Sequence, residues 1–167
     1  DAVWESAGEG YTTGGAFADV DLDGDLDLVV SSGNDMMPGG LQLYLNEAGI
    51  LSSAADWTSE THRYYGHIDV GDINGDGWPD VAISRFLGDD RFDSPGGVEV
   101  YLNRGGTLPE APDWSADGFF SFSCALGDMD GDGDLDLAVA VGEAYYNEPD
   151  VSLVFQNDGT GELGAGP

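Results

Sequence analysis

Positive charge is almost absent from this 167-residue chain, which has no lysine and only four arginines against 33 acidic side chains. The formal net charge of −29 excludes a nucleic-acid-binding protein held by phosphate contacts, because almost no cation is present to neutralise a phosphate backbone. The same charge argues against docking on an anionic membrane. No run of apolar residues approaches the roughly 20 that a membrane-spanning helix needs.

Cysteine occurs once, at Cys124, so an intramolecular disulfide is excluded and we expect a small buried apolar side chain. His62 and His67 have no partners at transition-metal spacing, which argues against a zinc site. Asp1 opens the chain with no visible signal peptide, so we expect a processed or trimmed piece. The hydrophobic content of 41% is too high for a disordered acidic tail, and the charge must therefore lie on a folded domain.

The chain repeats itself three times. The segments 18–30, 71–83 and 127–139 align, and their first aspartates are 53 and then 56 residues apart. Other residues recur in phase with them, namely Trp4, Trp57 and Trp114 before these segments and Asn46, Asn103 and Asn157 after them. Such a period indicates stacked structural repeats. We therefore divide the chain into units 1–56, 57–113 and 114–167, with the tryptophans in structural packing positions.

Each unit has the pattern of a small antiparallel sheet. In the second unit, one strand (66–70) enters an Asp-rich loop and another (80–84) leaves it. An alternating strand (98–102) follows, and a weaker segment (107–115) leads to the next tryptophan. Four short strands in about 55 residues is the size of one propeller blade. The predicted fold is an all-β β-propeller with three four-stranded antiparallel blades and a loop between the first and second strands of each.

The Asp-rich loops have the spacing of a calcium-binding loop. Oxygen-bearing side chains occupy loop positions 1, 3, 5 and 9, glycine occupies position 6, and the carbonyl at position 7 is a further expected ligand. The predicted ligands are Asp19, Asp21, Asp23, Asp27 and the carbonyl of Asp25 in loop 19–27; Asp72, Asn74, Asp76, Asp80 and the carbonyl of Trp78 in loop 72–80; and Asp128, Asp130, Asp132, Asp136 and the carbonyl of Asp134 in loop 128–136. Six or seven oxygens suit Ca²⁺ better than Mg²⁺, so we expect three Ca²⁺ per chain.

Two other interpretations compete with this one. A solvated acidic turn explains one such loop, but three loops in register, each with the glycine and all four oxygen side chains, argue against it. An EF-hand shares the first nine positions but needs glutamate at position 12, where this chain has Val30, Ile83 and Val139. Because an apolar β-branched run follows each loop, the loop belongs to a β-hairpin.

The string from Asp72 to Ile83, its two counterparts, Tyr101-Leu-Asn-Arg-Gly-Gly106 and Gln156-Asn-Asp-Gly-Thr160 resemble FG-GAP/VCBS repeats. The resemblance covers the whole chain and implies calcium-binding blades of an integrin-α-like propeller. The first unit departs from the pattern, with Leu22 where the others have Gly75 and Gly131. Propellers of this family usually close with about seven blades. We therefore expect a homo-oligomer that closes a ring, a dimer rather than a trimer, or else a piece of a longer propeller.

Ligand recognition is expected where the repeats differ, on the face opposite the calcium loops. The variable segments are 31–40, 84–97 and 141–150, and the inter-blade segments add Tyr11, His62, Arg63, Tyr64, Phe119 and Phe120. Aromatic, amide and charged groups on one rim suit a carbohydrate or protein ligand, although ordinary loop packing also explains each residue. The acidic surplus fits a salt-rich habitat, a cation-rich surface or solubility alone.

The function predicted from these features is a non-enzymatic, calcium-binding module that is secreted and takes part in binding or adhesion. Extracellular calcium is concentrated enough to fill weak sites. The alternative is the accessory or catalytic propeller of a secreted polysaccharide lyase or hydrolase. No Ser-His-Asp set or Cys-His pair can be recognised, and most acids in the motifs are assigned to calcium, so we expect no enzyme.

Overall fold

The computed structural model describes residues 2–142 and 150–164, and all regular structure in these ranges is β. Within them there is no helix with the length and apolarity needed to span a membrane. The strands are β1 (Thr12–Ala18), β2 (Asp27–Gly33), β3 (Pro38–Tyr44), β4 (Asn46–Glu47), β5 (Ile50–Leu51), β6 (Trp57–Thr58), β7 (Tyr64–Gly71), β8 (Asp80–Gly88), β9 (Arg91–Tyr101), β10 (Trp114–Asp117), β11 (Ser121–Gly127), β12 (Asp136–Val141) and β13 (Leu153–Phe155).

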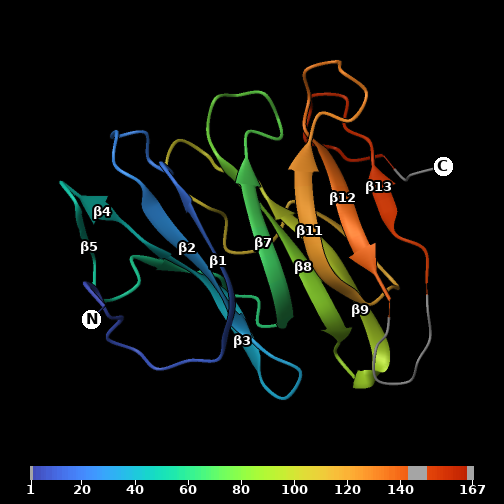
Figure 1. Ribbon diagram of the computed structural model, residues 1–167, viewed down its shortest axis with the longest axis horizontal. Helices are drawn as coiled ribbons and strands as arrows, with labels where there is room; N and C mark the ends of the chain where they lie inside the picture. Colours follow the sequence, from blue (N-terminus) through green and yellow to red (C-terminus); the bar gives the residue numbers. More distant parts are fainter. Residues whose placement is uncertain (1, 143–149, 165–167) are drawn as a thin grey trace.

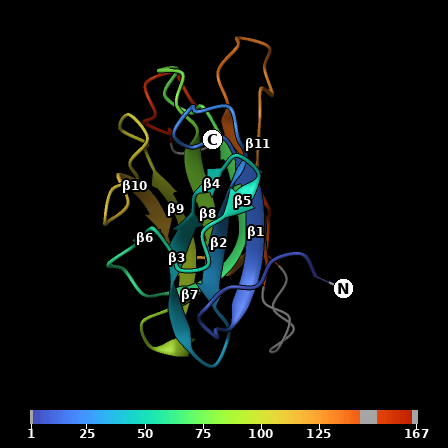
Figure 2. The same cartoon turned by 90° about the vertical axis from the view of Figure 1, so that its left-hand side faces the viewer.

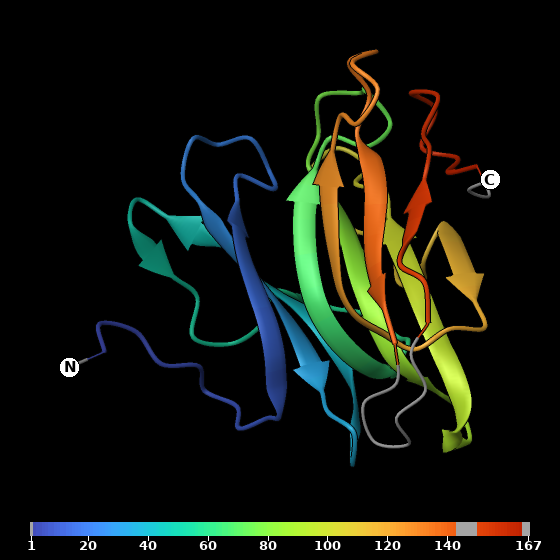
Figure 3. The ribbon, with the colours of Figure 1, turned by 45° about the vertical axis from the view of Figure 1, so that its right-hand side comes forward.

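The strands form three successive antiparallel sheets and one small hairpin. The first sheet has the order β1-β2-β3-β6, the second β7-β8-β9-β10, and the third β11-β12-β13, while β4 pairs with β5. The three sheets follow one another across the molecule (Figures 1 and 3). The predicted all-β class is confirmed, and the repeated antiparallel sheets fit a propeller-like fold. The third sheet has three strands among the described residues.

The strands that contain Trp57 and Trp114 are the outer strands of the first and second sheets. The repeat spacing had assigned each of them to the following sheet. Trp57 in β6 pairs with Leu43 of the first sheet, and Trp114 in β10 pairs with Val100 of the second. The predicted fourth strand at 107–115 is in fact β10, so only its last two residues are strand. The chain therefore passes to the next sheet after Trp57 and after Trp114, and not before them as in the predicted units. Figure 2 shows β6 and β10 on the side of the molecule opposite β1 and β11.

The segment 84–97, predicted to be a variable loop, is mostly strand. Residues of β8 and β9 pair as far as Gly88 and Arg91, which leaves a tight turn between the two strands. Phe86 and Leu87 are buried, so the apolar run of β8 continues beyond its predicted end. Of the predicted loop 141–150, residues 143–149 lie outside the described residues.

The hydrophobic core lies between the sheets. One buried cluster joins the first and second sheets and includes Val29, Leu43 and Ile83. A second cluster joins the second and third sheets and includes Val100, Leu137 and the buried, free Cys124, as expected for that cysteine. Because the second sheet is covered on both faces, eight of the nine residues of β8 are buried. A single sheet has no buried face until its neighbour packs on it.

The three repeating tryptophans make the same aromatic contact. Each packs edge-on against an aromatic residue at the end of a third strand, with interplanar angles of 73–77°. The pairs are Trp4 with Tyr44, Trp57 with Tyr101, and Trp114 with Phe155, with ring centroids 5.1, 6.5 and 5.2 Å apart. Trp57 and Trp114 thereby fasten the outer strand of one sheet to the next sheet. Edge-to-face contacts of this kind stabilise by about 0.5–1.5 kcal/mol beyond the area they bury.

Candidate metal centres

Each Asp-rich segment is the connection between the first two strands of its sheet. The last residue pairs of these hairpins are Ala18 with Asp27, Gly71 with Asp80 and Gly127 with Asp136. The three loops lie at the same edge of the molecule, at the top of Figure 1. The structure thus places loop positions 1 and 9 at the base of each hairpin, where short-range pairing brings their side chains together.

Carboxylates at positions 1, 3 and 9 converge in two of the three loops. Asp19, Asp21 and Asp27 each have an oxygen within 4.8 Å of the others. Asp128, Asp130 and Asp136 form the matching group in the third loop. In the second loop Asn74 stands at position 3, between Asp72 and Asp80, so the predicted ligands there include an amide oxygen in place of one carboxylate.

Hydrogen bonds from the backbone shape the loops in the same way. The position 1 carboxylate accepts from the N–H of the position 6 glycine in every loop, at 3.1, 2.9 and 3.2 Å. These glycines, Gly24, Gly77 and Gly133, have φ of 99°, 90° and 101°, a region that few other residues occupy. The chain therefore turns back on itself at position 6, as the spacing predicts.

The aspartates at position 5 lie outside the carboxylate groups. Asp23, Asp76 and Asp132 each accept a hydrogen bond from the N–H two residues later, at 2.9–3.0 Å. Those N–H groups belong to the position 7 residues Asp25, Trp78 and Asp134, the predicted carbonyl ligands. The side chain of Asp25 accepts a hydrogen bond from the N–H of Ala48 at 2.8 Å, and it is not part of the carboxylate group of the first loop.

The position 9 aspartates are buried and held by the backbone. Asp27, Asp80 and Asp136 are no more than 2% exposed. One oxygen of each accepts from the N–H at position 2 and the other from the N–H of the asparagine that follows the third strand, all at 2.7–2.9 Å. Burial raises the pKa of Asp27, and it raises the pKa of Asp80 from 3.8 to about 6 in spite of these hydrogen bonds.

The oxygens of these loops fit a hard cation. Oδ1 of Asp19 is buried without a hydrogen-bond partner, which is costly unless a cation lies beside it. Desolvation, and then the negative charges of Asp132 and Asp158, raise the pKa of Asp134. The donors are all carboxylate, amide or carbonyl oxygens, which Ca²⁺ and Mg²⁺ prefer and which zinc does not favour.

The asparagines at the ends of the third strands make hydrogen bonds to the loops, although the sequence marked them only as a periodic feature. Nδ2 of Asn103 donates to the carbonyl of Pro79 in its own loop and to that of Val20 in the preceding loop, at 3.1 and 2.8 Å. Asn157 makes the same pair of bonds to Leu135 and Ile73. Each of these asparagines thus ties one Asp-rich loop to the next. In the sequence, the only sign of this contact was that one asparagine follows each Asp-rich loop in phase with the repeat.

A sequence model of the FG-GAP-like repeat matches residues 19–83 and 86–139, more than half of the chain. The chain belongs to the FG-GAP-like repeat family. The two matched stretches contain all three Asp-rich loops, 19–27, 72–80 and 128–136. No curated protein matches the chain.

Leu22 is one of three non-glycine residues with a positive φ in the described part of the chain, beside Ala48 and Arg91. It has a φ of 57° at the position where Gly75 and Gly131 have φ of 70° and 82°. A left-handed conformation costs a residue with a side chain about 1–2 kcal/mol. Its side chain is 49% exposed and loses little burial on truncation. We expect Leu22→Gly to raise the free energy of unfolding by about 0.5–1 kcal/mol, after subtraction of the added entropy of the unfolded chain.

The matched control for this prediction is Leu26→Gly. Leu26 is similarly exposed and lies in the same loop, but its φ is not positive. Glycine in place of Leu26 adds entropy to the unfolded chain without relieving backbone strain. We therefore expect the free energy of unfolding to fall by about 0.5–1 kcal/mol. Urea denaturation of both variants is the measurement. Equal changes in the two variants would show that Leu22 is not strained.

The raised pKa of Asp80 predicts an unusual pH dependence in the absence of calcium. Between pH 3.8 and about 6 the folded protein holds a proton on Asp80 that the unfolded chain releases. The stabilisation of the folded state by this proton is therefore fully present below pH 3.8 and is lost as the pH rises through about 6. We expect the free energy of unfolding in EDTA to increase when the pH falls from 7 to 5, with about 1.4 kcal/mol available per unit of pKa shift.

Bound calcium should reverse this slope, because a cation holds the carboxylate ionised and lowers its pKa below the unfolded value. The stabilisation is then present above the unfolded pKa and lost as the pH falls through the folded one. Urea titrations at pH 5 and 7, with calcium and with EDTA, test the reversal. Asp80→Asn removes the titrating group and should reduce the increase in EDTA. A wild-type protein that loses stability on acidification in EDTA would contradict the assignment.

Proposed function

We propose that this chain is a calcium-binding β-propeller repeat module, non-enzymatic and secreted, with structural Ca²⁺ in three loops. The observation that supports this most strongly is the repeated oxygen set, with a buried position 9 aspartate in every loop and converging carboxylates in two of them. A loop of this kind wraps Ca²⁺ with six or seven oxygens. Binding neutralises carboxylates that otherwise repel one another, so calcium would stabilise the hairpins.

The ligand-binding part of this proposal rests on the end of the molecule away from the calcium loops. A hollow of about 410 Å³ there is lined by Tyr64, Phe86, Phe122, Asn34 and His67, among others. The rings of Phe86 and Phe122 stack with centroids 4.2 Å apart, and the second ring is 44% exposed. Apolar ring faces beside a few polar groups suit a sugar ring or a protein side chain.

The geometry gives less support to an enzyme. Among the described residues, neither histidine ring is hydrogen-bonded to a serine or cysteine side chain, and Cys124 is buried. Burial raises the pKa of the Cys124 thiol to about 12, which leaves it almost fully protonated at neutral pH. We therefore do not propose a lyase or hydrolase activity, and the activity screen described below would detect one.

A glycan array in millimolar calcium, run beside a polysaccharide lyase and hydrolase screen, tests this function. We expect binding without turnover. Phe122→Ala should weaken that binding at least tenfold, because it removes the exposed wall of the hollow. Phe17→Ala is the matched control, since this ring is 63% exposed and does not line the hollow. Turnover of a polysaccharide would contradict a non-enzymatic module.

A further inference from the structure

The third sheet exposes a face that is buried in the other two. Ala138 pairs with Val154, just as Val29 pairs with Leu43 in the first sheet and Ala82 with Val100 in the second. The four residues of the first two sheets are 0–3% exposed, because the next sheet covers them. On the third sheet Ala138 is exposed and Val154 is half-buried, beside a hollow of about 290 Å³. We call this surface the open face of the third sheet.

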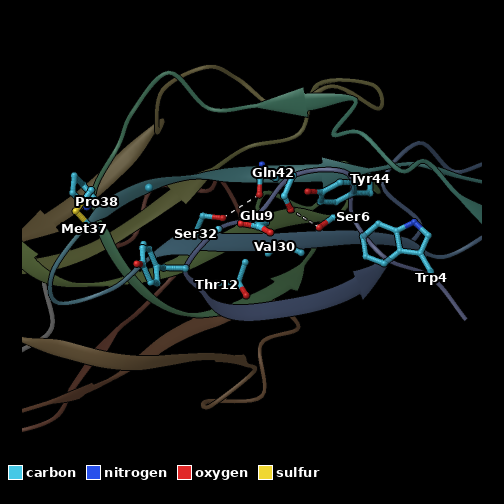
Figure 4. A pocket seen from close by; sticks show the side chains of 15 residues that line it. Trp4, Ser6, Glu9, Thr12, Val30, Ser32, Met37, Pro38, Gln42 and Tyr44 are labelled. Carbon is cyan, nitrogen blue, oxygen red and sulfur yellow. Dashed lines mark hydrogen bonds between the residues drawn. The ribbon is translucent and has the colours of Figure 1, made fainter. Parts of the chain in front are cut away.

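The first sheet exposes the complementary face. Val30 and Gln42 pair with each other, as do Ile83 and Glu99 in the second sheet. Ile83 and Glu99 are no more than 2% exposed, because the first sheet packs over them. Val30 and Gln42 are only half-buried and line, with Ser32 and Tyr44, a hollow of about 630 Å³ (Figure 4). We call this surface the outer face of the first sheet.

The outer edge of the third sheet is also incomplete among the described residues. The first and second sheets each receive a fourth strand from the tryptophan segment that precedes the following repeat. In both, the tryptophan lies opposite the residue equivalent to Val154, and the N–H before it donates to that residue's carbonyl at 2.8 and 2.9 Å. The remaining tryptophan segment, at Trp4, precedes the first repeat, and Val3 beside it is fully exposed.

The asparagine hydrogen bonds that join neighbouring loops are incomplete at the same two ends of the chain. In the described part of the chain, the third loop lacks the asparagine donor from a following sheet, and the asparagine of the first sheet lacks a preceding loop to bind. Asn103 and Asn157 each reach the carbonyl at position 2 of the preceding loop, where Val20 and Ile73 are 0% and 1% exposed. Their counterpart in the third loop, Met129, is 62% exposed. Among the described residues, the side chain of Asn46 donates only to the carbonyl of Leu26 in its own loop, and its Oδ1 is buried without a partner.

From these four observations we infer that the open face of the third sheet is the docking surface for the outer face of the first sheet of a second copy of this chain. In the complex, the partner copy's tryptophan segment adds to β13 as a fourth strand, with its Trp4 opposite Val154. The partner copy's Asn46 reaches the carbonyl of Met129 and completes the tie on the third calcium loop. The contact repeats the two interfaces already present inside the chain.

This contact is head-to-tail, so a ring forms when the rotation closes. Two copies bring six large sheets together, within the usual four to eight blades of a propeller. The net charge of −29 on each copy opposes association, and none of the described residues that line the two hollows is a lysine or an arginine. Association should therefore tighten as salt screens the repulsion.

Light scattering on the full chain in millimolar calcium, at 0.15 and 1 M NaCl, tests the inference. We expect a dimer of twice the 17.5 kDa chain mass, with the larger dimer fraction at high salt. Ala138→Glu places a charge at the centre of the open face and should yield the monomer. Ala111→Glu, at an exposed loop residue outside both faces, is the control and should remain dimeric. A wild-type monomer at both salt concentrations would overturn the inference.

A mixing experiment tests the direction of the contact. Val30→Glu blocks the outer face and Ala138→Glu blocks the open face, so each variant alone should be monomeric. Mixed together, they retain one intact face of each kind and should form a dimer through a single interface. Circular dichroism of each variant confirms that it is folded. No dimer in the mixture would overturn head-to-tail docking, whereas the bound calcium count reports on the loops independently.

Discussion

Removal of calcium with EDTA is expected to lower the Tm of this protein by roughly 15–30 °C relative to millimolar calcium. At free calcium a hundred times the Kd, one site adds about 2.7 kcal/mol, so three independent sites add about 8. For a chain of this length each kcal/mol shifts Tm by about 2–4 °C. The physical source is the crowding of Asp19, Asp21 and Asp27, and of the equivalent third-loop residues, whose oxygens lie within 4.8 Å of one another.

Thermal unfolding followed by circular dichroism measures this difference, and Mg²⁺ in place of Ca²⁺ is the control. Mg²⁺ retains its waters and needs a smaller octahedral site, so it should restore only a small part of the stability. Equal melting temperatures in EDTA and in calcium would show that the loops do not couple metal binding to folding.

Truncation of Asn103 is expected to cost about 3 kcal/mol and to lower Tm by roughly 6–12 °C. Its buried side chain donates to Pro79 in its own loop and to Val20 across the first interface between sheets. Oδ1 also accepts from the N–H of Gly106 at 2.9 Å. Alanine at this position leaves those groups without partners, and each unsatisfied buried polar group costs about 1–3 kcal/mol.

Asn46→Ala is the matched control, because Asn46 occupies the same place in the first repeat but its side chain donates, among the described residues, only to the carbonyl of Leu26. Its expected cost is about 1 kcal/mol, typical of one hydrogen bond. Asn157→Ala should resemble Asn103→Ala, since it makes the same two bonds across the second interface. Urea denaturation in calcium compares the three variants in the Ala138→Glu background, in which the chain is expected to be monomeric and Asn46 has no second copy to reach. Equal losses for Asn46 and Asn103 would contradict a role for these asparagines in joining the sheets.

Features that depend on short stretches of sequence were predictable. The positions of the Asp-rich hairpins follow from the aspartate spacing, because glycine at position 6 provides the left-handed turn and the apolar runs on both sides pair across it. The same local logic excluded the EF-hand helix. The all-β class and the family also followed from these motifs, and the family match confirms the latter.

Features that depend on pairing between distant residues were not predictable. Trp57 joins the sheet of Leu43 and not that of the strand that follows it, and only the three-dimensional pairing decides this. The segment 84–97 contains Gly, Pro and Asp and therefore has the composition of a loop, yet burial of Phe86 and Leu87 extends the hairpin through it. The tie from Asn103 to Val20 spans 83 residues, so local spacing could mark the asparagine but not its partner.

The most direct test of the account is the number of calcium ions bound per chain, measured by isothermal titration calorimetry and checked by equilibrium dialysis. We expect three for the wild-type protein, one for each Asp-rich loop. Asp72→Ala and Asp128→Ala should each bind two, because each removes the position 1 carboxylate of one loop. A wild-type chain that binds no calcium at millimolar concentration, or variants that bind as many ions as the wild type, would contradict the assignment of these loops as calcium sites.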